Sequence, residues 1–182
     1  RRLSSAASDV YKRQDYFTLM NERDGGIGGE PVRVVKCETA YNTEKGVECY
    51  ESTKGEGSLA YQPLSTGITY QLIPKASADN IPILSSGYGR TSAKNGKIFK
   101  WVFNFPGTYW DAASIATKHA MDMSGGSLDG KKIALVYHNS GYGKEPIRTL
   151  EVLSKKHNFE LMLLPCVLYT SPSPRDKSSS RM

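Results

Sequence analysis

The stretch QPLSTGITYQLIPKASADNIPILSSGYG, residues 62–89, decides the fold. An extended run leads into Ser65-Thr66-Gly67, a helical segment follows, and a second extended run, IPILS, ends at Ser85-Ser86-Gly87. Extended, helical and extended segments in this order predict a βαβ unit with parallel strands. Small hydroxyl residues and glycine stand where each predicted strand ends, and in open α/β sheets the loops at these ends hold ligands.

The rest of the chain repeats this alternation of strand and helix signals. Strands are predicted over residues 31–40, 58–64, 100–106, 131–138 and 159–165, and helices over residues 15–23, 108–123 and 144–158. Thr43 is predicted to cap a further helix that runs to about Lys54. Strands separated by single helices imply right-handed crossovers and a mainly parallel sheet that helices cover on both faces. The predicted fold class is therefore α/β.

The basic residues lie mostly at the two ends of the chain. Of the formal net charge of +6, residues 1–14 carry +3 and residues 166–182 carry +2, so residues 15–165 carry only +1. Both ends lack hydrophobic periodicity, and SSAASDVYKRQ and LYTSPSPRD resemble translated sequencing-adapter read-through. We therefore predict non-native extensions at residues 1–14 and 166–182, with genuine disordered basic tails as the alternative. No nucleic-acid partner is expected.

Cysteines and glycines are interpreted without special chemistry. Cys37 and Cys49 have no CxxC partner and no metal-ligand spacing, which favours two small buried or half-buried thiols, with a disulfide between them as the alternative. The Gly25-Gly26 and Gly28-Gly29 pairs precede a strand and do not link a strand to a helix, which favours a hairpin-like turn over a phosphate loop. No metal and no cofactor are expected.

The loops at Ser65 and Ser85 are candidate binding loops. Small residues let a ligand approach the backbone, while hydroxyls and free amides at a helix N-terminus donate hydrogen bonds to an anionic group. The alternative is that Ser65-Thr66 is a simple N-cap and Ser85-Ser86-Gly87 an ordinary loop. No Ser-His-acid arrangement, nucleophile elbow or carboxylate dyad is evident, so neutral donors and aromatics favour equilibrium capture of a ligand over enzymatic catalysis.

Three segments, RDGGIGGEPVRVV, NIPILSSGYG and IALVYHNSGYGKEPIRTLE, in this order resemble the type I periplasmic binding proteins of ABC transporters, of the branched-chain amino acid (Leu/Ile/Val) class. The resemblance extends from Asp15 to Pro165. It implies two α/β lobes that close on a small polar solute, such as an amino acid or amide, for delivery to an ABC permease. It also implies a periplasmic or extracytoplasmic location and a monomer when full length. The alternative is a ligand-sensing domain of a receptor or of an amide-responsive regulator.

The resemblance assigns residues 15–106 to a partial lobe one, without its first strand, and residues 107–165 to a partial lobe two. It places two solute-binding loops in lobe one and a closing tyrosine in lobe two. The residues concerned are Ser65, Thr66, Gly67, Ser85, Ser86, Gly87, Tyr88 and Tyr142. Because the second loop reads SSGYG, the bulky Tyr88 is expected to reshape the pocket. Because parts of both lobes are missing, the chain as printed is expected to fold poorly and to bind nothing tightly.

Overall fold

The computed structural model describes residues 5–86 and 90–166, with side chains described from residue 11 onward except that of Ser86. The chain divides into two compact units, Arg1–Gly57 and Ser58–Met182. These units have other bounds than the predicted lobes. The lobe boundaries therefore stay a prediction. Each unit is described by itself below.

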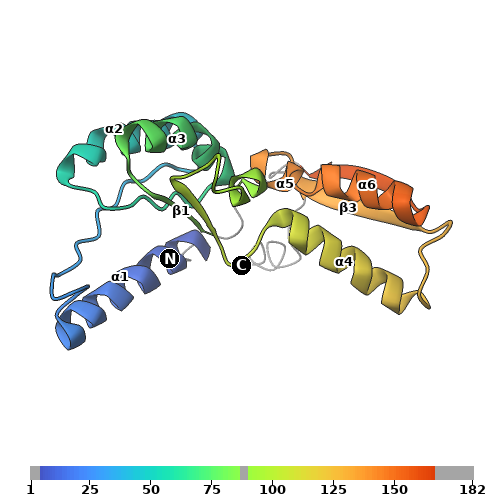
Figure 1. Cartoon of the computed structure of the whole chain (residues 1–182), viewed down its shortest axis with the longest axis horizontal. Coiled ribbons are helices and arrows are strands. Elements are labelled where there is room, and N and C mark those ends of the chain that lie inside the picture. Colours follow the sequence, from blue (N-terminus) through green and yellow to red (C-terminus); the bar gives the residue numbers. More distant parts are fainter. Residues whose placement is uncertain (1–4, 87–89, 167–182) are drawn as a thin grey trace, which may run out of the picture. The chain divides into compact units, whose positions relative to one another are not determined.

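The first unit contains the helices α1 (Ser5–Asp24) and α2 (Thr43–Thr53) (Figure 1). A short 3₁₀ turn, η1 (Lys54–Glu56), follows α2. The helix α1 begins ten residues before the predicted start, inside the segment that we interpret as an extension. After α1, the amide of Ile27 donates to the carbonyl of Glu30 at 2.9 Å, and the two residues between them, Gly28 and Gly29, have φ of 64° and 88°. Two consecutive positive φ angles mark a tight hairpin turn, which confirms the predicted turn.

The predicted strand over residues 31–40 is wrong, because the structure has irregular and largely exposed chain there. A strand needs a neighbour that completes its hydrogen-bond ladder, and no described strand pairs with this segment. The side chain of Asn21 takes part of that role. Its Oδ1 accepts from the amide of Val32 at 2.8 Å, and its Nδ2 donates to the carbonyl of Val32 at 2.9 Å. A helix side chain thus anchors the start of the segment.

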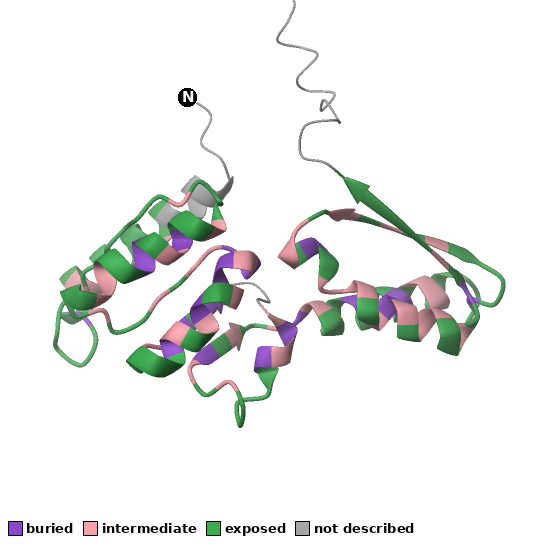
Figure 2. Ribbon diagram, turned by 90° about the horizontal axis from the view of Figure 1, so that it is seen from above, coloured by how far each residue is buried: buried purple, intermediate pink, exposed green. Residues whose placement is uncertain are grey.

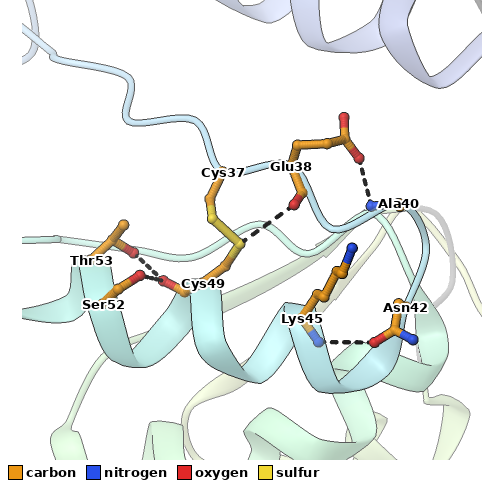
Figure 3. The surroundings of a disulfide bond; sticks show 8 residues. All are labelled: Cys37, Glu38, Ala40, Asn42, Lys45, Cys49, Ser52 and Thr53. Atoms are coloured by element: carbon orange, nitrogen blue, oxygen red, sulfur yellow. Dashed lines mark hydrogen bonds between the residues drawn. A yellow bond between two sulfur atoms is a disulfide. The ribbon is translucent and has the colours of Figure 1, made fainter.

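A disulfide joins Cys37 to Cys49, so the alternative interpretation of the two thiols is the correct one (Figure 3). The Cα atoms lie 5.7 Å apart, within the range that a disulfide requires. The helix start was also misassigned by one residue. Asn42 is the N-cap of α2, and its Oδ1 accepts from the amide of Lys45 at 2.9 Å, while Thr43 is already helical.

The second unit begins with the predicted βαβ arrangement. The helix α3 (Thr66–Asp79) packs on β1 (Ile83–Ser86), which pairs in parallel with β2 (Val102–Phe105). Buried Leu72 and Ala76 of α3 and buried Ile83 of β1 form part of the core, and Figure 2 shows buried positions along α3. The strand predicted over residues 58–64 shrinks to one bridge, in which Tyr61 pairs in parallel with Ile83.

The chain then alternates between helices and a second parallel pair of strands. A 3₁₀ turn, η2 (Thr91–Lys94), precedes β2, and α4 (Tyr109–Met123) follows it. The strand β3 (Lys132–His138) pairs in parallel with β4 (Glu160–Cys166), and between them lie α5 (Gly141–Lys144) and α6 (Ile147–His157). The helix α6 packs against β4, and α4 packs against α6. These elements confirm the predicted α/β class.

Coverage of the second sheet on both faces is not observed. Val136 pairs with Leu164, and two residues earlier Ala134 pairs with Met162, so these four side chains share one face. Val136 is 61% exposed and Leu164 48% exposed. Parallel sheets normally bury both faces. Here α6 packs against β4 and α5 contacts β3. One apolar face therefore stays open.

Candidate functional site

The first predicted binding loop forms the N-terminus of α3. Ser65 is the N-cap, since its backbone is extended and its Oγ accepts from the amide of Ile68 at 3.3 Å. The simple capping role therefore accounts for its hydroxyl in this structure. Ser65 and Thr66 are both buried, and the Thr66 hydroxyl lies 3.4 Å from the hydroxyl of Tyr109 at the start of α4. A helix N-terminus with two small residues and a glycine remains suited to an anionic group.

The second predicted loop follows β1 and is described only in part. Ser85 is 2% exposed and pairs in register with Asn104 of β2, and Ser86 is the last residue of the strand. Gly87 and Tyr88 lie outside the described residues. The two loops follow consecutive parallel segments, which places Ser65 and the end of β1 at the carboxyl edge of one sheet.

Tyr142 lies in α5, directly after β3, and is 42% exposed. Its ring centroid lies 5.9 Å from that of His138 and 5.9 Å from that of Tyr109. Because Tyr109 also reaches Thr66, one aromatic ring connects the first predicted loop with the predicted closing tyrosine. The backbones meet as well: a Cβ built on Gly141 would lie 3.6 Å from Cα of Gly67. The structure therefore brings Thr66, Gly67 and Tyr142 together.

A carboxylate that the sequence prediction missed lies at this junction. The hydroxyl of Tyr70 on α3 donates to Oε1 of Glu145, and the amide of Thr91 donates to Oε2 of Glu145 at 3.3 Å. The guanidinium carbon of Arg90 lies 5.2 Å from the centroid of the Tyr70 ring. Helical spacing places Tyr70 one turn after Thr66 on the same face of α3, but it does not indicate Glu145 as the partner of Tyr70.

Burial is the main cause that raises the pKa of Tyr70, and the hydrogen bond to Glu145 and the negative charge of Glu145 raise it further. The Tyr70 hydroxyl therefore stays protonated at neutral pH and acts as the donor in this pair.

Four buried side-chain atoms in the described part of the chain make no hydrogen bond: Thr91 Oγ1, Asn104 Oδ1, His138 Nδ1 and Ser140 Oγ. Each is close in sequence or register to the site. Thr91 touches Glu145, Asn104 pairs with Ser85, and His138 and Ser140 flank the Tyr142 turn. Buried polar atoms normally have partners, so this region retains capacity to hydrogen-bond. These hydroxyl, amide and imidazole groups suit a polar molecule.

A separate open depression of about 300 Å³ lies beside η2 and the start of α4. It contains none of the predicted binding residues. Lys94 and Asp111 both line this depression, and Nζ of Lys94 lies 3.4 Å from the carboxylate of Asp111. Within residues 5–86 and 90–166, no three His, Cys, Asp or Glu residues are grouped as metal ligands. No helix in these ranges has the length and apolarity to cross a membrane.

The family of periplasmic binding proteins matches residues 4–174 of the chain. A solved structure described as an ABC transporter permease from the Pseudomonas fluorescens group is 36% identical, with a TM-score of 0.73 over 92% of this chain and 43% of that chain. A branched chain amino acid ABC transporter from Thermus thermophilus with bound valine is 19% identical, with a TM-score of 0.77 over 90% of this chain and 42% of that chain.

An ABC transporter solute binding protein from R. palustris in complex with benzoate is 17% identical, with a TM-score of 0.72 over 97% of this chain and 48% of that chain. The last two likenesses show a shared fold. No curated protein matches the chain. The chain spans less than half the length of each of these three solved structures.

Proposed function

Because the chain belongs to the periplasmic binding protein family and has its type I fold, we propose that it is the substrate-binding component of an ABC importer. It captures a small polar solute, an amino acid or an amide, in a cleft between two lobes. The observation that carries this proposal is the meeting of the α3 N-terminus with the Tyr142 turn, through Tyr109 and through the Gly67–Gly141 approach. The family supports capture and delivery, and not catalysis.

The chemistry of the junction supports a solute with an anionic group, such as a carboxylate. Amides at the start of α3 and the partial positive charge of a helix N-terminus favour an anion. Aromatic rings of Tyr109 and Tyr142 supply apolar surface beside those donors, as pockets for small solutes do. The solutes named for relatives, valine and benzoate, are both carboxylates, and this supports the same chemistry here.

The disulfide between Cys37 and Cys49 supports the location that the proposal requires. Disulfides persist in oxidising compartments such as the bacterial periplasm and are rare in the cytosol. We therefore place the protein outside the cytoplasmic membrane, where it passes its solute to a membrane permease. We propose that it acts as a monomer and without nucleic acid.

The experiment is a thermal screen of the full-length protein against amino acids, amides, urea and small carboxylates. A solute that binds only the folded protein stabilises it by about 2.7 kcal/mol at a hundredfold excess over its Kd, which raises the melting temperature. Alanine variants of Ser65, Thr66, Ser86 and Tyr142 then test the site. Ser114→Ala is the matched control, because Ser114 is an exposed hydroxyl on α4 that bonds only locally, to the carbonyl of Trp110.

We expect the site variants to lose affinity and Ser114→Ala to keep it. Unchanged affinity in all four site variants would refute the assigned site. A protein that no solute stabilises but that turns over a substrate would overturn the transport function.

A further inference from the structure

We propose that Glu145 is a positioning residue that aligns Tyr142 with the Ser65–Gly67 loop and holds the two sides of the site together before a solute arrives. This role in solute binding rests on the proposed function, whereas the positioning itself is argued from the contacts of Glu145. The carboxylate lies after α5 and receives hydrogen bonds from two segments on the other side of the site, α3 and η2.

Glu145 is close in the chain to the residue that it positions. Its amide donates to the carbonyl of Tyr142 at 3.2 Å, so the two residues belong to the same helical turn. On the other side, Tyr70 lies one turn after Thr66 on α3. The pair therefore connects two helical segments, each of which carries a predicted solute contact. A displacement of Glu145 moves Tyr142 with it.

The contact of Glu145 with Tyr70 is stronger than the other contacts at this junction. The Thr66–Tyr109 hydroxyl pair is neutral and long at 3.4 Å, and the Tyr109–Tyr142 rings are tilted at 5.9 Å. Hydrogen bonds to an ionised carboxylate are about twice as strong as neutral ones. Glu145 accepts a hydrogen bond at each of its two carboxylate oxygens. Two bonds fix the orientation of the carboxylate as well as its distance from α3 and η2.

The donor side of the pair is itself held in place. Arg90 covers the ring of Tyr70, and its Nε donates to Ser92 Oγ at 2.7 Å, within the same η2 segment that supplies the Thr91 amide. The carbonyl of Arg90 accepts from Nδ2 of Asn104 at 2.7 Å, which ties this segment to β2. The segment that donates the Thr91 amide to Glu145 is therefore fixed to the sheet formed by β1 and β2, and β1 leads into the second predicted loop.

The decisive test measures distance without any solute. In the full-length protein, with any free cysteine replaced by serine, spin labels are attached at Gln71→Cys on α3 and Lys155→Cys on α6, both exposed positions. Electron–electron resonance then gives the distance distribution between the labels. We expect Glu145→Ala to shift or broaden the distribution, and Glu145→Gln, which keeps one acceptor oxygen, to restore most of it. Glu151→Ala, a control on α6 that removes an ion pair with Arg148, leaves it unchanged.

A double-mutant comparison separates positioning from general damage to the fold. If Glu145 acts through Tyr70, then Tyr70→Phe reproduces the effect of Glu145→Ala, and the double variant is no worse than either single variant. Distributions of Glu145→Ala that coincide with those of the unmutated protein overturn the proposal. Effects that simply add in the double variant overturn it as well.

A second measurement uses L-isoleucine as the probe in calorimetric titration. Glu145→Ala is expected to weaken its binding about tenfold, within the range usual for coupling between linked sites. Equal affinity in Glu145→Ala and the unmutated protein overturns the proposal. Absence of L-isoleucine binding to the unmutated protein would instead count against the proposed solute class, and the distance measurement decides the role of Glu145 in that case.

Discussion

Gly143 lies directly against the backbone of His138. A Cβ built on Gly143 would lie 2.0 Å from the carbonyl oxygen of His138 and 2.9 Å from its nitrogen, closer than carbon atoms approach in proteins. The end of β3 and the turn of α5 are thus packed backbone on backbone, and this packing sets the position of Tyr142, one residue earlier. Glycine is required here for space, since its φ is not in the left-handed region.

Gly143→Ala is therefore expected to displace the Tyr142 turn. Overpacking of this kind typically lowers the free energy of unfolding by about 1–3 kcal/mol. The full-length protein should melt at a lower temperature and lose solute affinity together. Gly107→Ala is the matched control, because a Cβ on Gly107 meets nothing within 4 Å and its φ is not positive. Equal melting temperatures in the two variants would contradict the packing argument.

A comparison of two N-caps separates the capping role of Ser65 from a role in solute binding. Thr108 caps α4 as Ser65 caps α3, and its hydroxyl accepts from the amide of Asp111 at 3.1 Å. Each alanine variant should lose about 1 kcal/mol of stability in denaturant unfolding, the usual value of a cap. Only Ser65→Ala should also lose solute affinity. If both variants keep their affinity, Ser65 is a cap and nothing more.

Reduction of the Cys37–Cys49 disulfide is expected to loosen the first unit. The two residues are 12 apart in sequence, and closing a loop of this size contributes about 3 kcal/mol in the chain-entropy account. Hydrogen exchange should accelerate in α2 after treatment with a reductant, as it should in Cys37→Ser. The free and exposed Cys166 gives the control Cys166→Ser, which should change nothing. Identical exchange with and without reductant would contradict this.

Sequence patterns predicted most elements of the second unit, although the strand predicted over residues 58–64 shrank to one bridge, and they predicted the turn at which α3 begins. The βαβ pattern of residues 62–89 is strong because the hydrophobic run, the capping residue and the glycine all indicate the same helix start. Ser65 is indeed the N-cap of α3. The pattern failed for residues 31–40, whose β-branched residues favour a strand while strand formation depends on a neighbour. Propensity carries no information about that neighbour. The missed Glu145–Tyr70 contact has the same cause, since 75 residues separate the partners in sequence.

The chain as printed is expected to behave as an incompletely packed protein. Phe105 is 76% exposed and Val136 61% exposed, and both belong to two-stranded sheets. Such small sheets are marginal in stability, and exposed apolar faces bind hydrophobic dyes. The 182-residue chain should bind anilinonaphthalene sulfonate and unfold over a broad temperature range. A sharp cooperative transition together with micromolar solute binding would contradict this expectation.

The Tyr70–Glu145 pair makes alkaline pH a probe of the site. Burial and the neighbouring carboxylate raise the pKa of Tyr70 above its usual value of 10.0. A raised folded-state pKa means that the contribution to stability is fully present below pH 10 and is lost as the pH rises through the folded-state value. Absorbance at 295 nm should therefore show a tyrosine that ionises after the others. Tyr70→Phe should remove that late step, and Glu145→Gln should shift it to lower pH, because the amide carries no negative charge. A late step that persists in Tyr70→Phe would assign it to another tyrosine and contradict the protonated Tyr70 donor.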